Sequence, residues 1–184
     1  MSRLLVPCAF ACLVLAASSP GQEGKPKPSK LSVAVLKFAR DHVGKKVGDG
    51  ECTALAIAAL KSAGGKTTYD FGVSGLDKDY KWGKLVKEAD ALPGDIIQFR
   101  DVVTVTKTVT KTAAGTSTRT MSRSYPHHTA VIAQNLGKGK FEVYEQNSGG
   151  AGTSEVERKK VRENPLDLAG KTEGTVWIYR AVKK

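Results

Sequence analysis

Apolar side chains recur at helical spacing in two segments in the first third of the chain. The first segment predicts an amphipathic helix that begins at Ser29 and ends at Gly44, and its apolar positions are Leu31, Ala34, Val35 and Phe38. Residues 52–60 read Cys-Thr-Ala-Leu-Ala-Ile-Ala-Ala-Leu and are apolar on nearly every face, which is typical of a buried helix. This second helix follows the glycine turn at 48–50 and ends at Gly64-Gly65.

Alternation of apolar and polar residues dominates the second half of the chain. A Pro-Gly-Asp turn at 93–95 precedes a predicted strand at 96–99. Residues 102–120 alternate Val, Thr and Lys and predict a long hairpin that turns at 113–115 and is polar towards its tip. Further strands are expected at 129–134, 141–146 and 175–182.

The remaining segments lack a clear period. We expect residues 66–92 to be mostly loop with a short helical turn near 84–89, and residues 148–174 to be mostly loop. Helices therefore come first and strands later, which predicts an α+β fold with an antiparallel sheet. A chain of 184 residues is long enough for one such domain.

The first residues look like a secretory signal peptide. Arg3 precedes an uncharged apolar stretch at 4–17, and small residues follow at 16–19. The apolar stretch is shorter than the roughly 20 residues of a transmembrane helix. We expect a signal peptide at 1–21, a Pro- and Lys-rich linker at 22–30 and one catalytic domain at 31–184, with an uncleaved anchor or a lipoprotein as the alternative. The mature protein would be secreted, periplasmic or attached to the cell envelope, without a transmembrane segment.

The net charge of +11 indicates the kind of partner rather than the fold. A basic exported protein is attracted to polyanions such as an anionic cell-wall polymer, although a solvated basic surface is the simpler interpretation. No repeat of aromatic and basic residues suggests a specific nucleic-acid module.

Cysteine usage directs attention to one side chain. The chain has three Cys, and removal of the signal peptide would leave Cys52 alone, so that it could form no internal disulfide. Cys52 is either a buried thiol or a reactive one. Its place at the start of a helix favours reactivity, because free amides and the helix dipole stabilise a thiolate there.

A nucleophilic thiol needs a base and a group that orients the base. Of the three His residues, His42 lies near the end of the first predicted helix, while His127 and His128 lie at the mouth of a strand. We take His128 as the base and His127 as its less favoured alternative. Because side chains alternate along a strand, Glu145 and Asn147 share one face of the neighbouring strand, where they can hold an imidazole nitrogen.

Four short motifs, in this order, resemble the CHAP domain, the cysteine, histidine-dependent amidohydrolase/peptidase. They are Gly-Glu-Cys-Thr-Ala-Leu at 50–55, Pro-Gly-Asp-Ile-Ile-Gln-Phe at 93–99, His-Thr-Ala-Val-Ile at 128–132 and Glu-Gln-Asn at 145–147. The resemblance covers about residues 31–182 and implies a papain-like fold with hydrolysis of amide bonds, commonly in peptidoglycan. The Thr-rich hairpin is longer than is usual in that family, and we expect no attached cell-wall-binding module.

The resemblance assigns a role to each candidate residue. Cys52 resembles the nucleophile, His128 the base, Glu145 the residue that orients His128, and Asn147 a supporting polar group. The implied reaction needs no cofactor, and no cluster in the sequence has metal-ligand spacing. The alternative, motivated by the long hairpin and the charge, is a non-catalytic exported module that binds cell wall or polyanions on the same fold.

Overall fold

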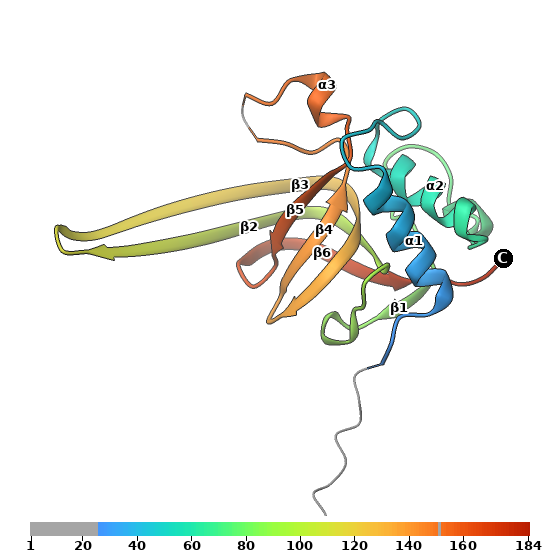
Figure 1. Cartoon of the computed structure of the whole chain (residues 1–184), viewed down its shortest axis with the longest axis horizontal. Helices are drawn as coiled ribbons and strands as arrows, with labels where there is room; N and C mark the ends of the chain where they lie inside the picture. Colours follow the sequence, from blue (N-terminus) through green and yellow to red (C-terminus); the bar gives the residue numbers. More distant parts are fainter. Residues whose placement is uncertain (1–25, 151) are drawn as a thin grey trace, which may run out of the picture.

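Two helices lie side by side against a six-stranded antiparallel sheet in the computed structural model, which describes residues 26–150 and 152–184 (Figure 1). The helices are α1, Lys30–Asp41, and α2, Cys52–Ala63. The predicted signal peptide lies outside the described residues. In the part of the chain that the structure describes, no helix is long and apolar enough to cross a membrane.

The sheet has the strand order β1-β6-β2-β3-β4-β5, and every neighbouring pair is antiparallel. The strands are β1 Lys84–Val86, β2 Ile96–Thr112, β3 Gly115–Gly137, β4 Lys140–Glu145, β5 Arg162–Asp167 and β6 Lys171–Arg180. This arrangement confirms the predicted α+β fold class with helices first and strands later.

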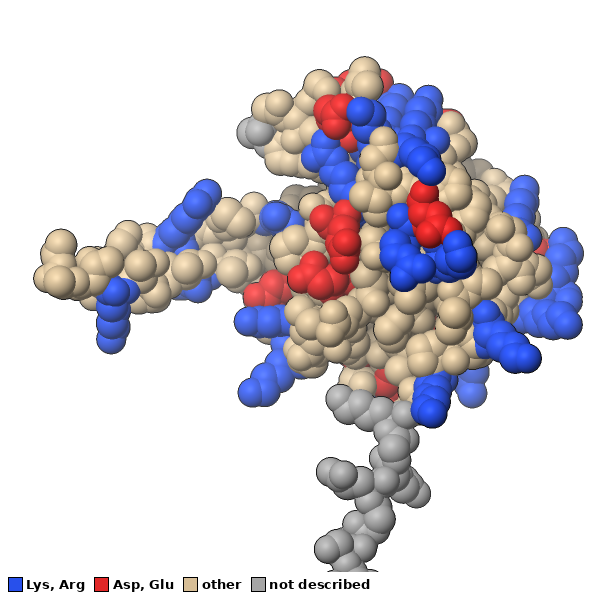
Figure 2. Space-filling view, in the orientation of Figure 1, with Lys and Arg blue, Asp and Glu red and all other residues tan. Residues whose placement is uncertain are grey.

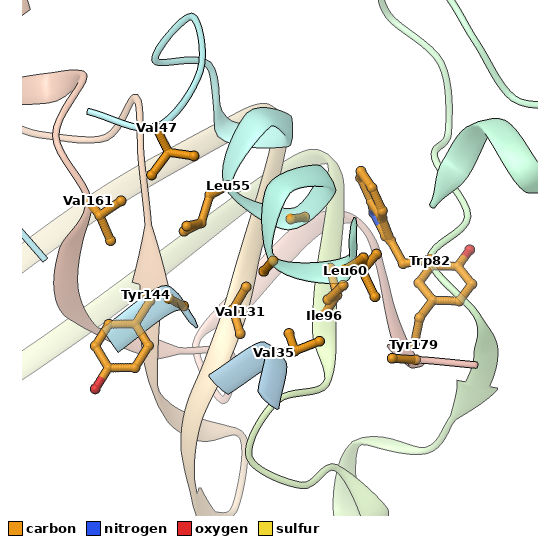
Figure 3. Packing of buried hydrophobic residues seen from close by; sticks show 14 of the residues in the cluster. Val35, Val47, Leu55, Leu60, Trp82, Ile96, Val131, Tyr144, Val161 and Tyr179 are labelled. Carbon is orange, nitrogen blue, oxygen red and sulfur yellow. The ribbon is translucent and has the colours of Figure 1, made fainter. Parts of the chain in front are cut away.

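Both faces of the sheet are covered with apolar side chains. Ile96, Val131 and Tyr144 pack in one cluster with Val35 of α1 and Leu55 of α2 (Figure 3). The neighbouring residues of these strands point to the opposite face of the sheet and form a second buried cluster. This cluster includes Ile97, Ile132, Phe141, Val143, Leu166 and Ile178. The period of two therefore explains why these central strands read as continuous apolar runs.

Helix boundaries follow local signals in the sequence. The hydroxyl of Ser29 accepts a hydrogen bond from the Ser32 amide at 3.0 Å and caps α1. Gly64 adopts a left-handed conformation, with φ of 72°, and ends α2. The two predicted helices are confirmed, α1 ending a little before Gly44.

The Thr-rich hairpin is continuous with the central strands rather than separate from them. β2 and β3 stay paired from Ile96 and Val131 to Thr112 and Gly115, with the expected turn at the tip. Among the described strands, β6 pairs with β2 only between Ile96 and Thr104. β4 pairs with β3 only between Ala130 and Gly137. The outer part of the hairpin is therefore a two-stranded arm that extends from the body (Figure 1).

Two segments differ from their expected structure. The helical turn expected near 84–89 is wrong: Lys84–Val86 forms the short edge strand β1, and only Glu88–Asp90 forms a 3-10 turn, η2. Residues 148–174 were expected to be mostly loop but hold the short helix α3, Glu155–Arg158, and the strand β5. β5 is an edge strand that contains Pro165, and a proline in the sequence argues against a strand although an edge tolerates it. A second 3-10 turn, η1, spans Thr68–Phe71.

The Pro-Gly-Asp turn before β2 has a structural role. Gly94 has φ of 86°, and a Cβ atom there would lie 2.0 Å from the carbonyl oxygen of Ser32 in α1. The buried carboxylate of Asp95 accepts hydrogen bonds from the Arg180 guanidinium of β6 at 3.1 and 2.9 Å. Burial raises the pKa of Asp95, although the bonds from Arg180 oppose the shift. The turn thus joins α1, β2 and β6.

Candidate active site

Cys52 is the first residue of α2 and is 8% exposed. No side chain caps this end of the helix, because Glu51 occupies the N-cap position without a capping bond. Backbone N–H groups of the first turn have no partner within their own helix, and they carry the positive end of its dipole. The start of α2 therefore suits a thiolate and an oxyanion.

The loop before Cys52 is held by the buried side chain of Gln146, which follows β4. Its Oε1 accepts a hydrogen bond from the Val47 amide at 2.9 Å. Its Nε2 donates to the carbonyl oxygens of Val47 and Glu51, at 2.9 and 2.8 Å. Sequence reasoning missed this residue, which connects the start of α2 to the strand that bears Glu145.

Gly50 allows the same loop to pass close to a neighbouring segment. It has φ of 91°, and a Cβ atom there would lie 2.8 Å from Cβ of Lys159. Any larger residue would push the loop away from the segment after α3. The glycine in the Gly-Glu-Cys motif thus has a packing reason as well as a conformational one.

His128 and Glu145 form a buried pair on adjacent strands. The Nε2 atom of His128 lies 2.7 Å from Oε2 of Glu145, and both side chains are buried. The Cys52 thiol interacts with the same ring. Because Nε2 faces Glu145, Nδ1 is the ring nitrogen left for the thiol. The structure thus brings together three of the four residues selected from the sequence.

The surroundings of His128 favour its charged form. Burial of the ring by itself lowers the pKa, because it removes water from the imidazolium. The hydrogen-bonding thiol of Cys52 and carboxylate of Glu145 outweigh burial and raise the pKa of His128 from 6.5 to about 10. Cys52 and Glu145 together therefore favour the imidazolium form of His128, in which both ring nitrogens carry a proton.

Glu145 is in turn held by side chains from the edge of the sheet. The Nδ2 atom of Asn164, in β5, donates to Oε1 of Glu145 at 2.8 Å. Burial alone would raise the pKa of Glu145, but bonds from His128, Asn164 and Ser148 outweigh it and lower the pKa. Asn164 was not selected from the sequence, because it lies in the segment expected to be loop.

The contact of Asn147 differs from the one expected. Its Nδ2 atom donates to Oε2 of Glu51 at 2.6 Å, and the residue has φ of 55°. The ring nitrogen of His128 that Asn147 was expected to support is occupied by Glu145. Asn147 therefore positions the residue before Cys52 rather than the imidazole.

The other two histidines have different partners. His127 hydrogen-bonds the carbonyl oxygen of Lys78 at 2.7 Å, and its ring lies 5.0 Å from that of Tyr80. His42 bonds the carbonyl oxygen of Phe38 within α1. Of the three, His128 is the one that the structure pairs with a buried carboxylate.

A cleft of about 650 Å³ opens onto this pair. It lies between the base of the hairpin and the loop that carries α3, where Figure 2 shows a hollow. His128, Glu145, Asn147 and Asn164 all line it. Residues 26–150 and 152–184 contain no cluster of three or more His, Cys, Asp or Glu that could hold a metal ion.

The chain matches one protein-family model over residues 27–184, that of the AIM3/BBC1 cysteine proteinase-fold domain. The chain belongs to this family. Searches of curated proteins and of solved structures found no significant match. The AIM3/BBC1 assignment confirms the papain-like part of the predicted resemblance, whereas the CHAP domain itself was not matched.

Proposed function

We propose that this AIM3/BBC1-family domain is a cysteine hydrolase that cleaves amide bonds, as an amidase or an endopeptidase. The observation that carries the proposal is the buried chain of interactions from the Cys52 thiol through His128 to Glu145. A carboxylate that fixes one ring nitrogen leaves the other to exchange a proton with the nucleophile.

The arrangement supports a two-step mechanism. The Cys52 thiolate attacks the amide carbonyl carbon, a C–S bond forms, and the carbonyl electrons move to the oxygen. The Cys52 amide at the start of α2 is positioned to donate to this oxyanion. The His128 imidazolium gives its proton to the nitrogen as the C–N bond breaks, which releases an amine and leaves a thioester. Water, deprotonated by His128, then releases the acid and restores the thiol.

The charged form of His128 supports this order of events. Because the pKa of His128 is raised to about 10, the ring is an imidazolium, with a proton on each nitrogen, near neutral pH. It can therefore stabilise a thiolate before the substrate arrives and protonate the leaving amine afterwards. Glu145 compensates the buried positive charge and fixes the ring nitrogen that faces away from the thiol.

Peptidoglycan is the substrate that we propose to test first. This choice rests on the CHAP-like order of motifs, on the predicted signal peptide and on the net charge of +11. Amide bonds in stem peptides or cross-bridges would be the sites of cleavage. Mass spectrometry of digested wall fragments identifies which bond, if any, is cut.

Replacement of Cys52 by Ala tests the chemistry. We expect Cys52→Ala to lose at least about a thousandfold in turnover, because the nucleophile and base act as a unit. Folding should be retained, because Cys52 is a free thiol in no disulfide, and the change to Ala removes only its sulfur atom from the start of the helix. The control is Lys111→Gln, at an exposed residue of the hairpin outside the cleft, which should keep wild-type turnover. Wild-type turnover by Cys52→Ala would end the proposal.

One observation supports a second candidate, a module that binds anionic polymers. Between residues 102 and 126 the chain has four cations, Lys107, Lys111, Arg119 and Arg123, and no acid. Figure 2 shows basic side chains along the hairpin. Binding to wall polymer that weakens strongly with salt and persists in Cys52→Ala, without any hydrolysis by the wild type, would favour this candidate.

A further inference from the structure

Three arginines line the cleft that opens onto His128. They are Arg123 of β3, Arg158 at the end of α3 and Arg162 at the start of β5. The geometry points to a carboxylate subsite: the amide that this site takes carries a free carboxylate close to the bond that is cut. This inference rests on the proposed hydrolase function and deepens it by naming the substrate class.

The charge balance of the cleft wall supports the subsite. Glu145 is the one acidic residue among the residues that line the cleft, and it is buried and committed to His128 and Asn164. It therefore cannot neutralise the three guanidinium groups. Glu157 lies outside the cleft lining and, of the three, compensates only Arg162, at 3.7 Å, so the cleft wall keeps a net positive charge. A positive cleft with low-dielectric walls concentrates anions.

The contacts of two of the arginines hold their side chains without using all their donors. Arg123 donates from one terminal nitrogen to the Pro165 carbonyl oxygen at 3.3 Å. Arg162 donates from Nε to the Glu157 carbonyl oxygen at 3.1 Å, and its terminal nitrogen lies 3.7 Å from the Glu157 carboxylate. A guanidinium has five N–H donors, so both groups keep donors for a ligand.

The preferred partner of such groups is planar and anionic. A guanidinium matches a carboxylate through two parallel hydrogen bonds, which gives orientation as well as attraction. Arg158 is exposed on the far wall, formed by α3 and its loop, whereas Arg123 belongs to the base of the hairpin. A carboxylated group that enters between them would be held beside His128, where the scissile amide must lie.

Two small alkylating agents separate this inference from the hydrolase proposal. Iodoacetate is anionic and iodoacetamide is its neutral counterpart, and both alkylate the same sulfur, so the ratio of their rates at Cys52 reports the local attraction for a carboxylate. We expect Arg158→Gln/Arg162→Gln to lower this ratio about fivefold, as charges near the path of the reagent predict. Lys111→Gln/Arg119→Gln removes the same charge from the hairpin outside the cleft and should leave the ratio unchanged.

The outcomes are distinct. A ratio that is equal in the wild type and the cleft variant overturns the carboxylate subsite, even if iodoacetamide reacts rapidly. Slow reaction of wild-type Cys52 with iodoacetamide, as in an unactivated thiol, overturns the hydrolase proposal instead. Thermal unfolding of each variant checks that α3 stays folded when Glu157 loses its Arg162 partner.

A second measurement uses wall peptides in which carboxylates are either free or amidated. The wild type should show a lower KM for the free-acid peptides with a similar kcat. The Arg158→Gln/Arg162→Gln variant should lose this preference, because the subsite binds the substrate without taking part in the bond changes. The carboxylate subsite would be contradicted if the wild type and the variant preferred the free-acid peptides equally.

Discussion

At the scale of single residues, the buried charge of Glu145 depends on side chains that come from different parts of the sheet. His128 in β3 lies against one carboxylate oxygen, and Asn164 in β5 donates to the other. A buried carboxylate that loses a partner keeps the full cost of its desolvation. The side-chain amide of Asn164, in the edge strand β5, thus helps to fix the position of Glu145 beside His128.

We expect Asn164→Ala to affect both stability and reactivity. Loss of its bond to Glu145 should lower the free energy of unfolding by about 1–3 kcal/mol. The pKa of Glu145 should rise, because Asn164 helps to keep it low, and alkylation of Cys52 should slow several-fold. Urea denaturation and iodoacetamide kinetics measure the two effects. Asn135→Ala, which loses bonds to the Glu88 and Ala91 carbonyls outside the cleft, is the control, and an equal slowing of alkylation there would show that the contact with Glu145 is not the cause.

The raised pKa of His128 predicts a definite dependence of stability on pH. A group whose pKa is higher in the folded state binds its proton more tightly when folded. Its contribution to stability is therefore complete below pH 6.5 and is lost as pH rises through about 10. The stability difference between the wild type and His128→Gln should shrink over this range, by at most about 1.4 kcal/mol per pH unit.

Nuclear magnetic resonance of the imidazole nitrogens provides a direct check. The ring of His128 should still carry both protons at pH 8 in the wild type. Cys52→Ala should lower its pKa, because the thiol is one of the groups that raise it. A neutral ring at pH 8 in the wild type would contradict the proposed ion pair.

Residue types and spacing were enough to predict that Cys52, His128 and Glu145 lie together, because a helix start and two adjacent strands place them by simple geometry. Gln146 and Asn164 could not be found in this way. Gln146 acts on Val47, 99 positions earlier, and Asn164 acts across an edge strand that has no clear pattern of its own. Contacts of this kind depend on how the strands are ordered, which local periodicity does not contain.

At the scale of elements, the turn before β2 limits how closely α1 can approach the sheet. The position of Gly94 against the Ser32 carbonyl leaves no room for a side chain. We expect Gly94→Ala to lower the free energy of unfolding by about 3 kcal/mol or more, from the steric overlap together with the unfavourable φ.

Gly137→Ala is the matched control for this prediction. Gly137 also has a positive φ, of 80°, but open space surrounds the position of a Cβ atom there. It should therefore cost only about 1–2 kcal/mol, from backbone strain alone. Urea denaturation of both variants measures the difference. Equal losses would show that the approach of α1 does not limit stability.

How well each element could be predicted depends on how much of its surface is buried against neighbouring elements. α1, α2 and the central strands were predicted because buried faces impose a strong period on the sequence. β1 and β5 were missed, because each is a short strand at an edge of the sheet and packs fewer side chains into the core. The Pro165 of β5 adds a signal that points away from a strand.

At the scale of the whole molecule, the arm is the part that contributes least to the core. Every residue from 107 to 120 is exposed, and a two-stranded ribbon has little stability of its own in water. Its polar faces and its cations instead make it available for contact with other molecules. The arm and the core can therefore be tested separately.

We expect removal of residues 107–120, with Thr106 joined to Met121 through Asn-Gly, to leave the fold intact. The free energy of unfolding should change by less than about 1 kcal/mol, because no buried side chain is lost. The deletion removes Lys107, Lys111 and Arg119 and no acid. Retention on an anionic resin should fall while alkylation of Cys52 is unchanged. Loss of thermal cooperativity would show that the arm supports the core.

The bonds of Gln146 and Asn164 have a consequence for biosynthesis. Translation reaches Cys52 before it reaches Gln146, which holds the loop of Cys52, before the His128–Glu145 pair, and before Asn164, which holds Glu145. A nascent chain that stops before residue 164 carries the sulfur without its complete set of supports. The chemistry proposed for this site is thus withheld until translation has passed residue 164.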